Sequence, residues 1–301
     1  MNLPNRVTIT EVGPRDGLQM ETRILSIDQR LDLIAGLVEA GLPAIQVASF
    51  VHPGRVPQMA DAEALIQRLP STDEVQFSAL TLNLKGVERA CRTSIAWIEA
   101  SFSVSDTHCM ENSGMTVEQA CQETIRMIAV GQLAGRKIRG SLQCVFGCSD
   151  PMDTPLDQVV HAAQVVVDQG VDRLVLADTA GLATPPSVRR MLAAVLPVAG
   201  AVPVALHLHD TRGLGLVNVI AAMEMGIAHF DTALGGLGGC PFMKGAAGNI
   251  ATEDTLYLMD ALGISAGVRI EPIARWSRRL SRLFGHDLPG KVYRLGPDDP
   301  S

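Results

Sequence analysis

VALHLHDT, at residues 204–211, is an apolar run that ends in two histidines spaced two residues apart. The apolar run is typical of a buried β-strand. Because side chains alternate between the faces of a strand, His207 and His209 should point the same way at its carboxyl end. Two facing imidazoles are either satisfied core histidines or a pair of metal ligands, and oxygen ligands elsewhere in the chain would favour the metal.

Seven further runs rich in Val, Ile and Leu extend this pattern to the whole chain. With the first run they predict eight strands, at 7–12, 44–50, 75–80, 95–102, 138–146, 172–177, 202–208 and 228–233. Helical patterns follow the strands at about 28–40, 60–69, 83–93, 116–134, 155–169, 186–198, 214–225 and 252–262. Strand and helix therefore alternate eight times, an order that closes into an α/β fold, the (β/α)8 TIM barrel.

The ends of the predicted helices carry their own signals. Asp28 and Gly41 should cap the first helix at its two ends. An amphipathic segment at about 271–284 predicts an additional C-terminal helix, and its four arginines indicate a solvated face rather than a phosphate site. We expect a single domain over residues 1–301, with the barrel at about 6–262.

Composition excludes several classes of partner. Hydrophobic residues make up 47% and charged residues 19% of the 301 residues, a globular balance, and the formal net charge is −7. Without a run of Lys or Arg, nucleic acid and anionic membrane are poor partners, and no apolar run has the roughly 18 residues needed to cross a bilayer. We expect a small-molecule substrate, while the sequence leaves a homo-oligomer open.

The six cysteines indicate a reducing compartment. They are spread along the chain, and the N-terminal residues lack the basic and then apolar pattern of a secretory signal, so we expect free thiols and a cytoplasmic location. Cys144 and Cys148 are four residues apart, a possible metal pair. Since no second Cys/His pair accompanies them, the sequence disfavours a structural zinc site there.

Unusual residues collect where a barrel places its active site, after the carboxyl ends of strands. Arg15 and Asp16 follow the first strand, held between Gly-Pro and Gly. Asp178 and Thr179 interrupt the sixth strand at its top, where Asp178 is either functional or the cap of the next turn. A glycine-rich stretch after the eighth strand carries Cys240, and we interpret it as a mobile lid with a thiol.

Four candidate metal ligands converge from these loops. They are one carboxylate, one amide and two imidazoles: Asp16, Asn249, His207 and His209. Such a set suits a six-coordinate Mg²⁺ or Mn²⁺, with room for substrate or water, better than a closed tetrahedral zinc site.

The same residues carry a family resemblance. TEVGPRDGLQ at 10–19, ASFV at 48–51 with VPQM at 56–59, HLHDT at 207–211, and GGLGGCP at 235–241 through NIATED at 249–254 resemble 3-hydroxy-3-methylglutaryl-CoA lyases over roughly residues 6–268. The resemblance implies a divalent-metal carbon–carbon lyase that forms acetyl-CoA and acetoacetate, with a place in leucine catabolism. It implies the four metal ligands above, Arg15 at the substrate carbonyl and Cys240 in proton transfer.

Two positions depart from that resemblance. Gln46 stands where we expect glutamate, and unlike glutamate it cannot titrate. His108, in the Ser-Asp…Asn segment after the fourth strand, is also not expected. Both changes bear on the acyl group, so citramalyl-CoA or a bulkier 3-substituted glutaryl-CoA stays open as substrate.

Retro-aldol cleavage of such a thioester needs a base, a positive charge at the developing enolate, and a proton for its carbon. The metal and Arg15 would supply the charge and Cys240 the proton, with Asp178 as base and His207 or a metal-bound water as rivals. We expect Arg15, Gln46 and Thr179 to contact the substrate. A metal-binding barrel without catalysis is the alternative from another class, and a condensing enzyme that runs a related reaction forward is a further one. Arg15 and Cys240 are both present, and a barrel that only binds metal needs neither, so they argue against the barrel without catalysis.

Overall fold

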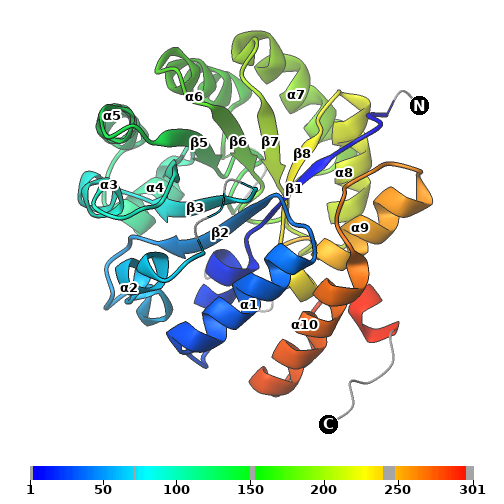
Figure 1. The fold of residues 1–301 in the computed structure, drawn as a ribbon. Coiled ribbons are helices and arrows are strands. Elements are labelled where there is room, and N and C mark those ends of the chain that lie inside the picture. Colours follow the sequence, from blue (N-terminus) through cyan, green and yellow to red (C-terminus); the bar gives the residue numbers. More distant parts are fainter. Residues whose placement is uncertain (1–2, 71, 73, 150–152, 240–247, 296–301) are drawn as a thin grey trace.

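Eight parallel strands close into one barrel in the structure, a computed structural model that describes residues 3–70, 72, 74–149, 153–239 and 248–295. Each strand pairs with the next along the chain, and the last pairs with the first, where Thr8 lies opposite His229. Figure 1 shows the strands at the centre and the helices around them. The predicted TIM barrel is therefore confirmed.

All eight predicted strands are present, mostly somewhat shorter than their sequence patterns. They are β1 Thr8–Glu11, β2 Ala44–Ser49, β3 Gln76–Thr81, β4 Trp97–Ser103, β5 Lys137–Gln143, β6 Arg173–Ala177, β7 Val204–His207 and β8 His229–Thr232. The fifth run, predicted to end at 146, leaves the sheet after Gln143 because the chain turns there, with Cys144 at a positive φ of 59°.

The predicted helices are also present, and one was missed. They are α1 Ile27–Glu39, α2 Ala62–Gln67, α3 Leu84–Cys91, α4 Asp106–Ser113, α5 Val117–Leu133, α6 Leu156–Asp168, α7 Pro185–Ala199, α8 Gly215–Glu224, α9 Thr252–Ala261 and α10 Ile270–Phe284. The missed helix, α4, lacks a strong apolar stripe. It begins where the Ser105 hydroxyl accepts the N–H of His108, and it ends at Gly114.

The N-terminal cap of α1 was predicted wrongly. Ser26, not Asp28, is the cap residue, and its hydroxyl accepts the N–H of Gln29 while the Gln29 side chain accepts the N–H of Ser26. This capping box satisfies two amide groups that Asp28, already inside the first turn, cannot reach. Gly41, with φ of +94°, follows the helix as predicted.

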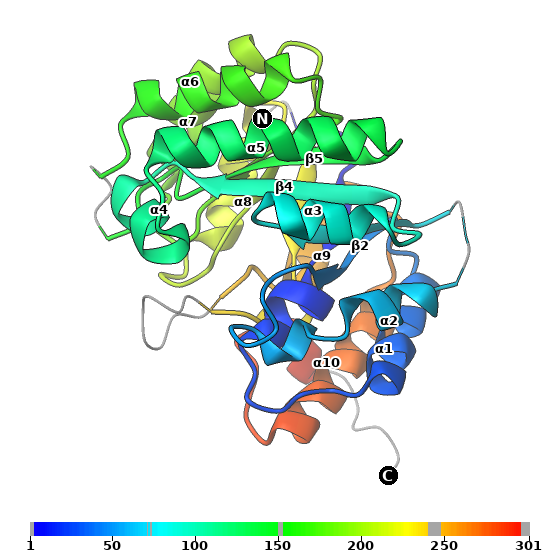
Figure 2. The same ribbon diagram turned by 90° about the vertical axis from the view of Figure 1, so that its left-hand side faces the viewer.

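Helix α10 packs against α1 and α9 and lies between them around the barrel (Figures 1 and 2). Gly36 of α1 lies directly beneath the Trp276 indole, where a Cβ atom would come within 1.8 Å of the indole nitrogen. Arg278 is buried and donates to the carbonyl of Tyr293, so not all arginines of this helix are solvated. In the part of the chain that the structure describes, no helix is long and apolar enough to cross a membrane.

Candidate active site

The carboxyl ends of the strands bring three of the predicted ligands together. Asp16 lies in the π-helical turn Gly13–Gly17 after β1, His207 is the last residue of β7, and His209 follows two residues later. The Nε2 atoms of the two histidines are 3.3 Å apart, and Asp16 Oδ2 is 3.9 Å from His207 Nε2. One ligand atom from each residue lies within 4.8 Å of the others.

Asn249 reaches the same point from the chain before α9. Its backbone bridges His209 in antiparallel fashion, and its side-chain amide donates to Asp16 Oδ2 at 2.7 Å. Its Oδ1 is buried and has no hydrogen-bond donor among the described residues. Gly238 makes room for it, because a Cβ there would lie 2.6 Å from Asn249 Nδ2.

The local charges set the protonation of these groups. Burial alone would raise the pKa of Asp16, but the charges of Arg15 and of the two histidines lower it to about 2. Burial and the nearby His207 lower the pKa of His209 to about 4, so this imidazole is neutral at pH 7. A carboxylate and a neutral imidazole are the forms in which these side chains bind a cation.

A carboxylate behind His207 fixes its orientation. Asp231 Oδ2 lies 3.5 Å from His207 Nδ1, which leaves Nε2 directed at Asp16 and His209. Although burial opposes the ionised form, Arg139 holds the pKa of Asp231 well below its usual range, through contacts of 2.6 and 2.8 Å. A carboxylate that orients a ligating histidine is the usual second partner in metal sites.

Asp231, Arg139 and Glu99 were missed from the sequence. Each lies on a strand, is almost fully buried and contacts a charged side chain of another strand. The sequence contained a signal for these residues, because a charged residue inside a buried strand needs a partner. Their partners lie on other strands, so spacing along the chain did not connect them.

Gln46 connects Arg15 to this interior. Its Oε1 accepts the Nε–H of Arg15, and its Nε2 donates to Glu99 Oε2 at 2.9 Å. Arg15 also contacts Asp16, 2.5 Å from its carboxylate. Arg15 is thus paired with Asp16, and the neutral amide of Gln46 does not leave its charge without a partner.

Asp178 and Thr179 lie at the top of β6 in hydrogen-bonded positions. The carboxylate of Asp178 accepts the N–H groups of Leu182 and Ala183, as expected of a turn cap. Burial raises its pKa to about 6. The Thr179 hydroxyl accepts the N–H of Cys144 at 2.9 Å.

Cys240 lies outside the described residues, so its proton-transfer role stays a prediction. The segment before it is anchored by Glu11, at the end of β1. The Glu11 carboxylate accepts from Gly13, Leu234 and Thr252, and so joins the turn that carries Asp16 to the loop after β8. Glu11 acts as a positioning residue that sequence analysis missed.

The donor set fits a divalent cation. Two imidazole nitrogens and one carboxylate oxygen lie within 4.8 Å of one another, and Asn249, whose amide contacts that carboxylate, has an Oδ1 without a hydrogen-bond donor among the described residues. The Asp231 carboxylate behind His207 is already in place. Mixed nitrogen and oxygen donors suit Mn²⁺ or Mg²⁺ with open positions, while thiolates, which favour zinc, are not among the described donors.

Comparison with known proteins gives consistent matches. The family model HMGL-like matches residues 6–279. Hydroxymethylglutaryl-CoA lyase YngG of Bacillus subtilis is 35% identical over 291 residues, which are 97% of this chain and 97% of that protein. The mitochondrial hydroxymethylglutaryl-CoA lyase of Mus musculus is 36% identical over 96% of this chain and 89% of its own length.

Solved structures agree with the sequence matches. The structure of an HMG-CoA lyase from Acinetobacter baumannii, in complex with coenzyme A and 3-methylmalate, superposes with a TM-score of 0.91 at 35% identity. The match covers 97% of this chain and 95% of that one.

Proposed function

This chain belongs to the HMGL-like family, whose relatives named above are carbon–carbon lyases, and from that premise we propose its reaction. It cleaves 3-hydroxy-3-methylglutaryl-CoA to acetyl-CoA and acetoacetate, with Mg²⁺ or Mn²⁺ bound by Asp16, His207, His209 and Asn249. The observation that carries the proposal is the convergence of these four side chains beside Arg15 at the mouth of the barrel.

The choice of acyl group rests on the relatives and on Gln46. Both relatives reported are named for hydroxymethylglutaryl-CoA, and one structural neighbour holds coenzyme A. Gln46 was the reason to consider citramalyl-CoA or a bulkier 3-substituted glutaryl-CoA. Its amide is matched to the carboxylate of Glu99, so a structural reason for glutamine at this position is at hand.

The reaction breaks the bond between C2 and C3 of the acyl group. The C3 hydroxyl gives up its proton, its oxygen becomes the ketone of acetoacetate, and the electron pair of the broken bond forms the enolate of acetyl-CoA. A divalent ion in the site would supply Lewis-acid activation of the hydroxyl and carbonyl oxygens. Arg15, fixed by Gln46 and Asp16, places a positive charge where the enolate charge develops.

Two proton transfers complete the chemistry. We assign the removal of the hydroxyl proton to Asp178, whose pKa of about 6 lets it accept a proton at neutral pH. His207, which presents Nε2 to the same site, is its rival. We assign delivery of a proton to C2 of the enolate to Cys240, which completes acetyl-CoA.

A panel of 3-hydroxyacyl-CoA thioesters, read out as acetyl-CoA released, tests this proposal. We expect the highest kcat/KM on 3-hydroxy-3-methylglutaryl-CoA, loss of activity with EDTA, and recovery with Mg²⁺ or Mn²⁺. Arg15→Gln should lower kcat by about a hundred- to a thousandfold. Arg68→Gln, which removes a guanidinium from an exposed ion pair, should leave the rate unchanged. A higher kcat/KM on another thioester, or full activity in excess EDTA, would overturn the substrate or the metal assignment respectively.

The remaining expectations concern the cellular setting. Cytoplasmic location, a place in leucine catabolism, and the absence of nucleic-acid and membrane partners stay predictions, as does any homo-oligomer. Cell fractionation and sedimentation of the purified protein check the first and the last of them.

A further inference from the structure

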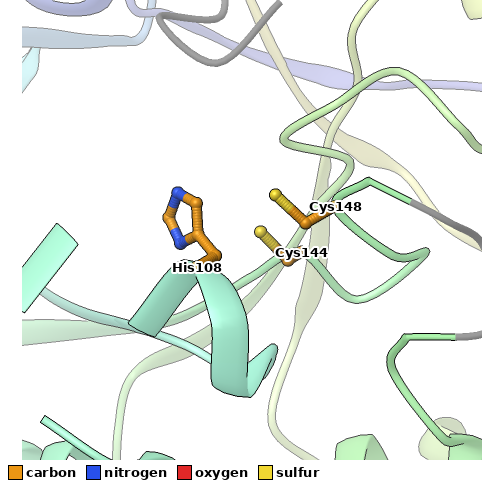
Figure 3. A group of neighbouring side chains, drawn as sticks. All are labelled: His108, Cys144 and Cys148. Carbon is orange, nitrogen blue, oxygen red and sulfur yellow. The ribbon is translucent and has the colours of Figure 1, made fainter. Parts of the chain in front are cut away.

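Three side chains with metal-binding donors meet beside the site described above. His108 projects from α4, and Cys144 and Cys148 lie on the segment that follows β5. One donor atom from each lies within 4.8 Å of the others. Figure 3 shows both sulfur atoms on the side that faces the imidazole ring. None of these residues belongs to the set that holds the Mg²⁺ or Mn²⁺ of the proposed reaction.

The backbone around the two thiols is specially shaped. Cys144, with φ of 59°, is the one non-glycine residue with a positive φ in the described part of the chain. Its N–H donates to the Thr179 hydroxyl, and the N–H of Cys148 donates to Asp153 Oδ1, both at 2.9 Å. A residue held in this costly conformation points to a functional arrangement, here one that turns both thiols the same way.

The chemistry of the cluster favours a cation. The two sulfur atoms lie within 4.8 Å of each other, close enough to share one ion after small side-chain rotations. His108 and Cys144 are buried, which shields them from solvent ligands. The carboxylate of Asp153 acts electrostatically on both His108 and Cys148 and adds negative charge beside them.

We propose that His108, Cys144 and Cys148 bind a Zn²⁺ ion in a second metal site. Two thiolates and one imidazole are a donor set that selects zinc over the harder Mg²⁺ and Mn²⁺. With Zn–S near 2.3 Å and Zn–N near 2.0–2.1 Å, tetrahedral donors stand roughly 3.5–3.8 Å apart. That spacing is within the 4.8 Å limit of the cluster, so small side-chain rotations suffice. Loss of the thiol protons on binding leaves a neutral unit of one Zn²⁺ and two thiolates.

The proposed zinc site reverses our conclusion, drawn from the cysteine spacing alone, that zinc at Cys144 and Cys148 is disfavoured. The sequence shows two cysteines four apart and no second pair, but the fold brings the third ligand from another helix. His108 is also a residue that the family resemblance does not lead us to expect. The zinc site is therefore specific to chains that carry a histidine at this position.

Zinc would join α4 to the segment after β5. Because Thr179 accepts the N–H of Cys144, this connection continues to the top of β6, next to the first metal site. Zinc should therefore raise the melting temperature of the reduced parent chain, and His108→Phe should make that rise smaller.

Cobalt serves as the spectroscopic probe for the test. The reduced, metal-stripped full chain is titrated with Co²⁺, and a thiolate-to-cobalt charge-transfer band in the near ultraviolet reports thiolate ligation. We expect the band in the parent, its displacement by Zn²⁺, and its loss in Cys144→Ser/Cys148→Ser. His108→Phe should weaken Co²⁺ binding by at least tenfold. Circular dichroism confirms that each variant is folded.

Control variants separate this site from the first one. His209→Ala, which removes a ligand of the first site, and Cys240→Ser and Cys121→Ser, which remove other thiols, should all keep the band. The proposal is overturned by a folded, reduced parent without the band. It is equally overturned by a band that survives Cys144→Ser/Cys148→Ser or disappears in Cys240→Ser.

Discussion

Replacing Gln46 by glutamate tests the interior of the barrel most directly. Gln46 is fully buried, with its carbonyl oxygen on Arg15 and its amide nitrogen 2.9 Å from Glu99 Oε2. In Gln46→Glu a carboxylate oxygen replaces that nitrogen and faces a second carboxylate. Two carboxylates about 3 Å apart cannot both be ionised in such a place, so they share a proton.

The size of the effect follows from the pKa of the introduced carboxyl group. Burial and the neighbouring carboxylate should raise it by about 3 units above its unfolded value of about 4.3. At about 1.36 kcal/mol per unit, the free energy of unfolding at neutral pH falls by about 4 kcal/mol. Because the folded state holds the proton more tightly, this loss is complete above a pH of about 7 and fades as the pH falls toward about 4.

Urea unfolding of the parent and of Gln46→Glu between about pH 5 and pH 8 measures this dependence. Gln46→Met is the matched control: it loses the same two hydrogen bonds without adding charge, so its cost should not vary with pH. In Gln46→Glu/Glu99→Gln the carboxylate and the amide exchange places, and most of the stability should return, since Asp231 still pairs with Arg139. A Gln46→Glu chain as stable as the parent, or with a loss independent of pH, would refute the contact with Glu99.

Three further predictions concern the site itself. Asp231→Asn replaces the carboxylate behind His207 with an amide and should lower the affinity for Mn²⁺ by about 10- to 100-fold, measured by calorimetry on the folded variant. An unchanged affinity would show that Asp231 does not orient His207. Asp178 must be ionised to accept a proton, and burial raises its pKa to about 6, so kcat/KM should fall as the pH drops below about 6. Asp178→Asn should abolish activity without altering Mn²⁺ binding. Alkylating reagents should inactivate the parent enzyme, and bound substrate should protect it, whereas Cys240→Ser should already have lost most activity. A fully active Cys240→Ser would show that another group delivers the proton to the enolate carbon.

The barrel was predictable because strand composition, helix periodicity and glycine punctuation repeat eight times along the chain. Errors arose where local chemistry lacked that repetition. The N-cap of α1 is Ser26 and not the predicted Asp28, because the reciprocal hydrogen bonds between Ser26 and Gln29 satisfy two amide groups. Helix α4 was missed because its eight residues are mostly polar.

The ligands of the first metal site, in contrast, could be predicted from the sequence. Its ligands sit immediately after strand-like runs, and the carboxyl ends of parallel strands meet at one end of a barrel. The partners behind those ligands were not readable. Arg139 and Asp231 lie on β5 and β8 and meet across the barrel interior, a contact that only the closed sheet defines. The same holds for His108 and the two cysteines.

One connected row of buried groups shows what Gln46 contributes. Hydrogen bonds and ion pairs join its members in the order Asp16, Arg15, Gln46, Glu99, Arg139, Asp231 and His207. Along the row negative and positive groups alternate, with the amide placed between Arg15 and Glu99. The carboxylate that contacts Gln46 is that of Glu99 on β4, one hydrogen bond further from Arg15 than position 46. A glutamate at 46 would set two negative charges side by side, while glutamine keeps every charge next to an opposite charge or a dipole. Arg15 therefore has one carboxylate in direct contact, that of Asp16, and is linked to the carboxylate of Glu99 only through the amide of Gln46.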